Sequence, residues 1–577
     1  MPAKKKQLAG VPEWAKDAIW YQIFPERFRN GSRKNDPRLV DMGVDREIKG
    51  WGITPWGGDW YKQAKWEKPI GDFFRSVYLR RYGGDLIGIR EKLDYLEELG
   101  VNAIYLNPVF HAQSLHKYDA SSMHHIDPTL GPDRDGDFRM IAKARETEDP
   151  KTWVWTKADR YFLELVADIH RRGMRVIIDG VFNHTGRDFF AFRDILKNGR
   201  KSRYRDWYKI KKWNPDGTID YDGWFGHKAL PEFGRTEENL ARPVRKYIFD
   251  ITARWMDPDG DGDPSDGVDG WRLDVAFCVP HLFWKQWRRH VKKLNPEGYT
   301  TAEIVTLAED YLKGDEFDAV MNYMWLFPTV NFFSPNKNAI PVNDFRKGME
   351  LIRKTYPEDV SYVLQNLTDS HDVGRIATMI ENAFPPIHDF GQYFELTRVH
   401  KQRDLITTKP SRKTYDIMRQ IAVFQATYLG APMIYYGTEV GMWGANDPCD
   451  RQPMLWSDIK YEAESMTVNG KTKSRKRAPD MGLFRFYAKA FALRTQSATL
   501  RRGTLHWVKT ASDRLAAYER RLGSSRILVL LNASDREVTH AIKTSAMDLW
   551  ENGREVSKGM VSVPPRGWRV LQLSFRT

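Results

Sequence analysis

The feature that most constrains the fold is a repeated unit in which a helical pattern ends at a glycine and an apolar strand follows at once. Residues 85–99 place leucine and isoleucine at helical spacing, Gly100 follows, and residues 101–110 form an apolar run. The same order of helix, glycine and strand recurs over residues 161–182. Such units are typical of parallel β/α architecture.

Six further short apolar strands can be read at residues 19–24, 268–275, 299–304, 317–323, 363–367 and 432–436. Together with the two above, they predict an α/β fold, a TIM (β/α)8 barrel whose active site lies at the C-terminal ends of its strands. Residues 185–245 are rich in aromatic, charged, glycine and proline residues and too long for an ordinary loop. They predict an inserted subdomain after the third strand.

The residue pattern changes in the last part of the chain. Short alternating segments at residues 515–518, 527–531 and 568–573, separated by Gly, Asn and Pro turns, predict a C-terminal antiparallel β-sandwich. The predicted organisation is a basic N-terminal tail (1–16), a first part of the barrel (17–184), the inserted subdomain (185–245), the rest of the barrel (246–494) and the β-sandwich (495–577).

Composition narrows the function classes. The net charge of +14 comes from 90 basic and 76 acidic residues that are interspersed, which argues against a nucleic-acid partner. No apolar run is long enough to span a membrane, and no apolar stretch follows the lysines of the first ten residues as in an export signal. The two cysteines, Cys278 and Cys449, argue against a disulfide-stapled secreted scaffold. We expect a cytoplasmic protein, with export followed by removal of a leader as the alternative.

Polar side chains gather just after four of the predicted strands. The segments are Asp179-Gly-Val-Phe-Asn-His184, Gly270-Trp-Arg-Leu-Asp274, Ala302-Glu-Ile304 and Asp369-Ser-His-Asp372. In this order and position they resemble the four signature regions of the α-amylase family, glycoside hydrolase family 13. The resemblance runs from Trp20 to Phe575 and implies an enzyme that acts on α-glucans.

Other segments are similar to the neopullulanase and cyclomaltodextrinase branch of that family. They are Tyr-Gln-Ile-Phe-Pro-Glu-Arg-Phe at 21–28, His-Lys-Tyr-Asp at 116–119, Gly-Asp-Glu-Phe-Asp-Ala-Val-Met-Asn-Tyr at 314–323 and Asn-Asp-Pro-Cys-Asp-Arg at 446–451. The chain begins almost directly at the barrel, so we expect it to lack the extra N-terminal β-domain of many members. The oligomeric state is left open.

Retaining cleavage of a glycosidic bond needs two carboxyl groups about 5 to 5.5 Å apart, one ionised and one protonated. Asp274 and Glu303 end consecutive predicted strands, and we expect them to be nucleophile and general acid/base. Arg272 lies two residues before Asp274 on the same strand face, so its charge is expected to keep the nucleophile ionised. Glu309 is the alternative acid, but counting back from Phe317 of the matching segment favours Glu303.

The resemblance implies roles for further residues. Asp372 would bind the hydroxyls of the reacting sugar, and His184 and His371 would donate hydrogen bonds to the same ring. Tyr118 would stack beneath that sugar. The alternatives are ordinary core histidines and simple packing of the tyrosine.

More distant sugars are also assigned by the resemblance. Asp447 and Arg451 would bind the next sugars on the non-reducing side, and Glu232 would contact the leaving-group sugars.

The pair of Arg272 and Asp274 also has an alternative interpretation, which is a buried ion pair without a catalytic role.

Two segments predict structural calcium, and no organic cofactor is expected. The first alternates carboxylates and glycines as a calcium loop does, without the full EF-hand spacing, and its ligands would be Asp257, Asp259, Asp261, Asp263 and Asp266. A solvated acidic turn is the alternative. The second is similar to a calcium site of the neopullulanase branch, with Ser32 at a usual Asp position, and its ligands would be Asn30, Asn35, Asp36, Gly57 and Asp59.

The expected function is that of a retaining α-glucan hydrolase acting on maltooligosaccharides, starch, pullulan or cyclodextrins. Val275 follows the expected nucleophile, and in this family a valine at that position accompanies tolerance of α-1,6 as well as α-1,4 bonds. Phe277, Cys278 and Val305 differ from the residues that the neopullulanase branch usually has at these positions. A transglycosylase is the first alternative, because a sugar hydroxyl can replace water. A non-catalytic carbohydrate-binding relative is the second. The expected partner is the glucan alone, with no membrane.

Overall fold

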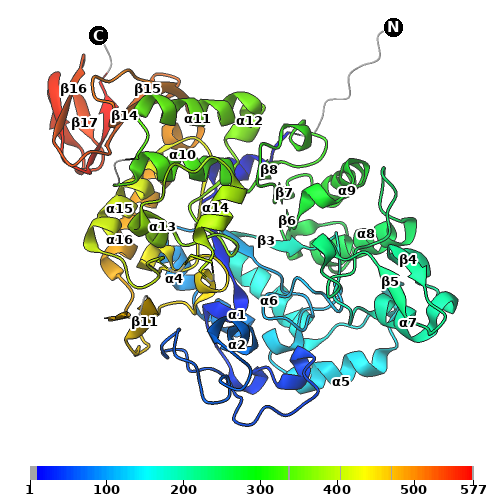
Figure 1. The fold of residues 1–577 in the computed structure, drawn as a ribbon. Coiled ribbons are helices and arrows are strands. Elements are labelled where there is room, and N and C mark those ends of the chain that lie inside the picture. Colours follow the sequence, from blue (N-terminus) through cyan, green and yellow to red (C-terminus); the bar gives the residue numbers. More distant parts are fainter. Residues whose placement is uncertain (1–9, 336–337, 400, 403, 469–470, 575–577) are drawn as a thin grey trace, which may run out of the picture.

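A barrel of eight parallel strands forms the centre of the computed structural model (Figure 1), which describes residues 10–335, 338–399, 401–402, 404–468 and 471–574. The strands are β1 (Trp20–Ile23), β2 (Ala103–Leu106), β3 (Arg175–Gly180), β6 (Gly270–Leu273), β7 (Tyr299–Ala302), β8 (Ala319–Val320), β9 (Gln365–Leu367) and β10 (Ala431–Tyr435). Their order is β8-β7-β6-β3-β2-β1-β10-β9, and a parallel bridge from Met321 to Gln365 links the two ends. The predicted TIM barrel is confirmed.

Helices surround the barrel. Those between and after its strands are α1 (Pro25–Phe28), α2 (Phe73–Ser76), α3 (Leu86–Glu91), α4 (Leu93–Leu99), α5 (Arg134–Ala144), α6 (Lys157–Arg171), α8 (Arg242–Met256), α9 (His281–Leu294), α10 (Tyr323–Phe333), α11 (Val342–Thr355), α12 (Glu358–Ser361), α13 (Ile376–Asn382), α14 (Phe390–Thr397), α15 (Arg412–Thr427) and α16 (Met481–Thr495). The helical pattern read over residues 85–99 is two helices, α3 and α4, broken at Lys92. Gly100 ends α4 with a φ of 86°, a conformation that glycine adopts without strain.

The insert after β3 contains α7 (Phe190–Asn198) and an antiparallel hairpin of β4 (Ile210–Trp213) and β5 (Ile219–Tyr221). Its aromatic side chains pack against the barrel helix α8, where the Tyr247 ring lies 5.7 Å from Phe189 and 5.6 Å from Trp207. This packing fixes the insert beside the C-terminal ends of the neighbouring strands. Because α8 begins at Arg242, the helix starts a few residues before the predicted boundary at 245.

The C-terminal part is antiparallel, as predicted. A six-stranded sheet has the order β13-β14-β15-β20-β17-β18, a two-stranded sheet pairs β16 with β19, and a separate hairpin pairs β11 with β12. The elements are β11 (Glu464–Val468), β12 (Lys471–Arg475), α17 (Ala498–Arg502), β13 (Thr504–Trp507), β14 (Leu515–Leu522), β15 (Ser525–Asn532), β16 (Val538–Ile542), β17 (Ala546–Asp548), β18 (Arg554–Val556), β19 (Gly559–Val563) and β20 (Trp568–Leu573). Apolar side chains of both sheets, Leu530 and Val563 among them, form one buried cluster.

Part of the predicted N-terminal tail packs against the barrel. Residues 1–9 lie outside the described part of the chain, but Glu13–Asp17 form a 3-10 helix. The Trp14 ring packs 5.8 Å from Trp20 of β1 and 5.7 Å from Tyr299 of β7. This segment therefore belongs to the barrel. Within the described residues, no helix is long and apolar enough to cross a membrane.

Candidate active site

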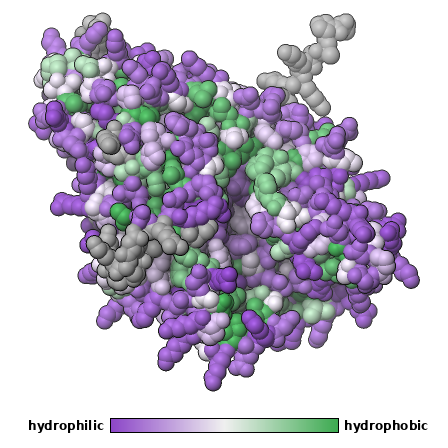
Figure 2. All heavy atoms as spheres, in the orientation of Figure 1, coloured by the Kyte–Doolittle hydropathy of each residue, from purple (hydrophilic) through white to green (hydrophobic). Residues whose placement is uncertain are grey.

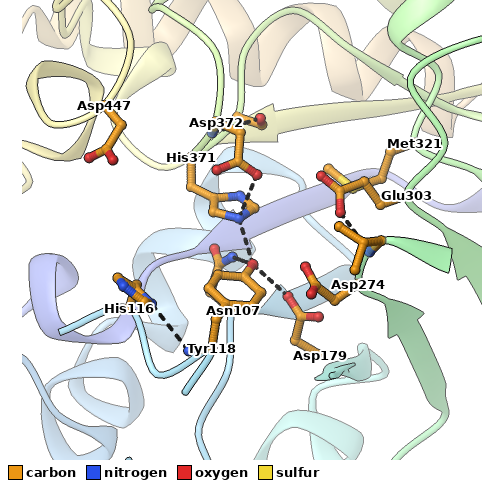
Figure 3. Close-up of polar contacts among 12 residues, drawn as sticks. Asn107, His116, Tyr118, Asp179, Asp274, Glu303, Met321, His371, Asp372 and Asp447 are labelled. Atoms are coloured by element: carbon orange, nitrogen blue, oxygen red, sulfur yellow. Dashed lines mark hydrogen bonds and ion pairs between the residues drawn. The ribbon is translucent and has the colours of Figure 1, made fainter. Parts of the chain in front are cut away.

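One buried arginine connects carboxylates from three adjacent strands. Arg272 on β6 is fully buried, and its Nη1 lies 2.9 Å from Asp179 Oδ1 and 3.0 Å from Asp274 Oδ1. Its Nη2 lies 2.9 Å from Glu303 Oε2. Because β3, β6 and β7 are neighbours in the barrel, their C-terminal ends bring these groups to one point (Figure 3). The site thus has three carboxylates, those of Asp179, Asp274 and Glu303, in contact with a single guanidinium group.

Glu303 follows β7 directly and is held by the backbone of the residue after Asp274. The Val275 N–H donates a hydrogen bond of 2.9 Å to Glu303 Oε2. Val275 has a φ of 37°, which is rare for a β-branched residue and places strain beside the candidate site. Glu309, the alternative acid, is exposed in a short 3-10 helix after the strand. The geometry therefore favours Glu303 over Glu309.

The opposite side of the site carries Asp372 in the loop after β9. Arg451 Nη2 donates a 3.0 Å hydrogen bond to Asp372 Oδ1, and His371 Nε2 lies 2.9 Å from Asp372 Oδ2. The same His371 nitrogen lies 2.5 Å from the Tyr118 hydroxyl, and the two rings stack with centroids 5.4 Å apart. Figure 3 shows Asp372 and His371 facing Asp274 and Glu303 across the site, with Tyr118 between them.

Burial and charge act differently on the three carboxyl groups. Burial raises the pKa of Asp274 well above its usual value and also raises the pKa of Glu303, although Arg272 opposes both effects. For Asp372, burial is outweighed by His371 and Arg451, which lower its pKa. The Arg272 contact expected from the sequence is present, yet burial still raises the pKa of Asp274. Together the groups favour an ionised Asp372 beside a carboxyl pair that holds a proton.

The remaining predicted sugar-binding residues lie around this centre. Asp447 Oδ1 is 3.2 Å from Arg451 Nη1, so it belongs to the same charged network. His184 follows β3 and lies 5.6 Å from the Trp224 ring, and burial lowers its pKa to about 3. Glu232 forms a backbone bridge with His184. Its Oε2 is already engaged by Lys209 at 3.1 Å and by an arginine of the insert at 3.0 Å.

Sequence reasoning gave no role to several residues that the structure brings to the site. Asp179 accepts hydrogen bonds from the hydroxyls of Tyr105 at 2.6 Å and Tyr118 at 2.9 Å. Asn107 Nδ2 donates to the Tyr118 hydroxyl at 3.0 Å. Asp179 lies in the last two residues of β3, and Asn107 directly follows β2. Both are polar residues at the C-terminal end of a barrel strand, which is the criterion that identified Asp274 in the sequence.

Aromatic side chains lie near His184 at the edge of the insert. The Trp224 and Phe225 rings meet edge to face with centroids 5.0 Å apart, and Phe225 is 71% exposed. Phe277, three residues after Asp274, is 41% exposed. Figure 2 shows this face of the molecule hollowed near its middle, with hydrophobic patches around the hollow. Exposed rings at this position offer apolar faces to a sugar.

The calcium site proposed near the N-terminus is corrected by the structure. Asn30 Nδ2 donates to Asp36 Oδ1 at 2.7 Å, and a side chain at Gly83 would collide with both residues. Asn35 Nδ2 donates to Asp85 Oδ2 at 3.1 Å, while Asn35 Oδ1 is buried without a hydrogen-bond partner. The glycine and the aspartate that contact Asn30, Asn35 and Asp36 are thus Gly83 and Asp85, whereas the sequence predicted Gly57 and Asp59.

The predicted Gly57 and Asp59 lie elsewhere. Gly57 packs against the Lys460 carbonyl, and Asp59 accepts hydrogen bonds from the backbone of Tyr61 at 3.1 Å and Ser465 at 3.1 Å. The sequence contains Gly-Gly-Asp twice, at 57–59 and at 83–85, and only the fold distinguishes them.

The acidic loop before β6 assembles three of its five predicted ligands. Asp257, Asp259 and Asp266 bring carboxylate oxygens within 4.8 Å of one another. Asp261 and Asp263 are not part of this cluster. Like Asp257 and Asp259, they accept hydrogen bonds from backbone N–H groups of the loop, at 2.7 Å and 3.0 Å.

The chain combines a TIM barrel with a pair of carboxylates that one arginine holds at the strand ends. These features place it in the class of barrel glycosidases. The chain also matches the family model of the alpha amylase catalytic domain over residues 22–148 and 157–503. The protein belongs to the α-amylase family and is a glycoside hydrolase of the neopullulanase and cyclomaltodextrinase type.

Two relatives and one solved structure illustrate the similarity. Neopullulanase 2 of Thermoactinomyces vulgaris is 35% identical over 92% of this chain and 71% of its own length. A cyclomaltodextrinase of a Bacillus species is 34% identical over 90% of this chain and 73% of its own length. The cyclic α-maltosyl-(1→6)-maltose hydrolase of Arthrobacter globiformis, in complex with that sugar, is 25% identical with a TM-score of 0.70, covering 98% of this chain and 100% of its own.

Proposed function

We propose that this α-glucan hydrolase retains anomeric configuration and cleaves mainly α-1,4 bonds of maltooligosaccharides, with Asp274 as nucleophile and Glu303 as general acid/base. The observation that carries the proposal is that one guanidinium group, that of Arg272, contacts both carboxylates, at 3.0 Å and 2.9 Å. A retaining mechanism requires such a closely held pair, with one carboxyl ionised and the other protonated.

In the first step, the protonated Glu303 donates its proton to the glycosidic oxygen while Asp274 attacks the anomeric carbon. The bond to the leaving sugar breaks, and a covalent glycosyl ester forms on Asp274. In the second step, Glu303 takes a proton from water, and the water oxygen replaces Asp274 at the anomeric carbon. The hydrogen bond from Val275 N–H to Glu303 Oε2 leaves the other oxygen of Glu303 to carry the proton.

The facing residues supply sugar binding in this proposal. Asp372, kept ionised by His371 and Arg451, accepts hydrogen bonds from hydroxyls of the reacting sugar. His371 and His184 donate to the same sugar, and Tyr118 offers its ring as a stacking surface. Asp447, tied to Arg451, binds the next sugar on the non-reducing side. Glu232 lies on the leaving-group side, where its two cationic partners orient it.

The proposed bond preference follows from departures near the leaving-group side. Val275 favours tolerance of α-1,6 bonds, but Val305 stands where relatives of this branch place a tryptophan platform. A missing platform removes about 1 kcal/mol of stacking, enough to change preference several-fold. We expect pullulan and cyclodextrins to be hydrolysed more weakly than maltooligosaccharides.

The experiment is a comparison of kcat/KM on maltohexaose, pullulan and β-cyclodextrin, with product sizing. NMR of the first product identifies the anomer released. Initial release of the β-anomer would contradict the retaining mechanism, and exclusive cleavage of α-1,6 bonds would contradict the proposed preference.

A second candidate function is transfer of glucosyl units to sugar acceptors. The exposed rings of Phe225 and Phe277 support it, since Phe225 packs against Trp224 near His184 and Phe277 follows Asp274 by three residues. A sugar stacked there would compete with water for the glycosyl ester. The ratio of transfer products to reducing ends at high maltotriose concentration measures this activity.

We propose calcium at Asn30, Asn35 and Asp36. The unpartnered, buried Asn35 Oδ1 and the adjacent Asp36 carboxylate provide the hard oxygen donors that calcium prefers. Asp257, Asp259 and Asp266 are a second candidate, supported by their converging oxygens. Calcium bound there would hold loops in place and take no part in bond cleavage.

We also propose that the protein works in the cytoplasm. Both of its cysteines, Cys278 and Cys449, are free thiols. Free thiols fit a reducing compartment. Fractionation of the native host cells, followed by immunodetection, tests this placement.

A further inference from the structure

A cluster of two histidines and a glutamate lies outside the candidate active site. His124 Nε2 is 3.3 Å from Glu146 Oε2, and His125 Nε2 is 2.8 Å from the same oxygen. The two histidines follow β2 in the long loop before α5, and Glu146 follows α5. Their ligand-type atoms lie within 4.8 Å of one another. The proposed sugar chemistry uses none of these three residues.

The outer nitrogens of both rings are held by further groups. His125 Nδ1 lies 2.9 Å from Asp159 Oδ2, and His124 Nδ1 lies 2.9 Å from the Tyr247 hydroxyl. With the ring proton on Nδ1 in each case, both Nε2 lone pairs point toward Glu146. An Asp–His pair of this kind is the usual support for a metal-binding histidine.

The glutamate and one ring are also fixed in orientation. Glu146 Oε1 accepts a 2.7 Å hydrogen bond from the Val154 N–H, which leaves Oε2 facing the two imidazoles. The Trp153 ring stacks on His124 with centroids 4.5 Å apart and planes 2° apart. The three ligand atoms are therefore held close together before any ion binds.

The cluster has an open side. A cavity of about 760 Å³ is lined by His124 and Glu146, together with Ser121, Ser122 and Asp188. His124 and His125 are themselves buried, with 2% and 0% of their surfaces exposed. The cavity gives an ion a path to the buried ligands and leaves room for water at a fourth coordination position.

We propose that His124, His125 and Glu146 bind one divalent transition-metal ion, with Zn2+ as the expected occupant. Tetrahedral zinc with bonds of about 2.0 to 2.1 Å places its ligands roughly 3.3 to 3.4 Å apart. The separation of 3.3 Å between His124 Nε2 and Glu146 Oε2 matches this spacing, and the 2.8 Å between His125 Nε2 and the same oxygen would widen by about 0.5 Å on metal binding. Two imidazole nitrogens and one carboxylate suit zinc, whereas calcium selects oxygen ligands.

The local charge allows a dication. Metal binding needs both histidines neutral. In that state the carboxylates of Glu146 and Asp159 face one cation, Arg254, whose Nη2 lies 3.4 Å from Asp159, so the ligand set without the ion carries one net negative charge. The competing arrangement is a metal-free network in which a charged His125 bridges Glu146 and Asp159, and direct measurement of metal binding separates the two.

The test uses the full chain, freed of metal and titrated with Zn2+ in the presence of excess calcium, so that oxygen sites are filled. We expect one zinc per chain. Glu146→Gln, which keeps size and hydrogen bonding, and His124→Gln should each weaken zinc binding by about 10- to 100-fold or more. His506→Gln on strand β13, far from the cluster in sequence, is the matched control and should bind as the unmodified chain does.

A second measurement does not depend on any variant. Co2+ added to the metal-free chain should give the intense visible absorption of a tetrahedral site, and one equivalent of Zn2+ should abolish it. Absence of zinc binding by the unmodified chain, or equal binding by Glu146→Gln and the unmodified chain, would overturn the proposal. An octahedral cobalt spectrum that zinc leaves unchanged would also overturn it.

Discussion

The backbone N–H of Val275 donates a 2.9 Å hydrogen bond to Glu303 Oε2, which couples the residue after the proposed nucleophile to the proposed acid. Val275 adopts its positive φ, 37°, where it makes this contact. The strained backbone therefore helps to orient the carboxyl group across two adjacent strands.

Glu303→Gln should keep this geometry, because the amide oxygen of glutamine can accept the same hydrogen bond. We expect loss of activity on natural glucans, since an amide cannot protonate the leaving oxygen. Substrates whose leaving group needs no protonation should retain the first step. The matched control is Glu309→Gln, an exposed glutamate six residues on, which should leave kcat unchanged. The reverse result would show that Glu309 is the acid.

Asp274→Asn should lower kcat by about 1000-fold or more, because the neutral amide cannot form the covalent intermediate. Binding of maltooligosaccharides, measured by calorimetry, should remain, since Asp372 and Arg451 keep their contact of 3.0 Å. Asp261→Asn in the exposed acidic turn serves as control. A variant at position 274 that keeps a tenth of the unmodified kcat would disprove the nucleophile assignment.

Glu439 should make stability depend on pH. Its Oε1 accepts hydrogen bonds from Tyr21 at 2.9 Å and Tyr95 at 2.5 Å, but burial raises its pKa from 4.5 to about 7. Between these pH values the unfolded chain releases the proton and the folded chain keeps it, so stability falls as pH rises through this window.

Glu439→Gln removes this dependence. Relative to the unmodified chain, the variant should gain about 3 kcal/mol in free energy of unfolding between pH 4.5 and about 7, as an order of magnitude. Urea denaturation at the two pH values measures the change. If the free energies of unfolding of the variant and the unmodified chain differ by the same amount at both pH values, Glu439 does not titrate in this range. Glu309→Gln is the control for the effect of replacing an exposed glutamate.

Calcium added to the metal-free chain should raise its melting temperature, because an ion that binds only the folded state stabilises it by about 2.7 kcal/mol at 100 times Kd. Asp36→Asn should reduce the rise, whereas Asp59→Asn should not, because Asp59 is bound to the backbone of Tyr61 and Ser465. Differential scanning calorimetry checks this pair. Equal responses of the two variants would remove the site at Asn30, Asn35 and Asp36.

Phe277→Ala should lower the ratio of transfer to hydrolysis several-fold while changing hydrolysis of short maltooligosaccharides little, because a stacking surface of about 1 kcal/mol is lost. Chromatography of products at high maltotriose concentration gives the ratio. Met560→Ala removes an exposed apolar side chain from β19 in the C-terminal part and is the control. An unchanged ratio would exclude Phe277 as an acceptor platform.

Local patterns explain why so much of the barrel was predictable. A buried parallel strand is a short apolar run, and a glycine ends the preceding helix, so each of the eight strands left its own signal. The barrel rule then placed Asp274 and Glu303 at one edge from their positions alone. The pattern over residues 85–99 did not reveal the break at Lys92, because both helices bury the same kind of leucine face.

By itself, the sequence determined the parallel barrel, the order of its strands along the chain and the residues at the strand ends, because these depend on spacing within a few residues. Only the tertiary structure decided which Gly-Gly-Asp segment joins Asn30 and Asp36, and only it brought Glu146 to His124 and His125. These groupings join residues from different loops. Their proximity arises from packing of the whole barrel, which no local pattern encodes.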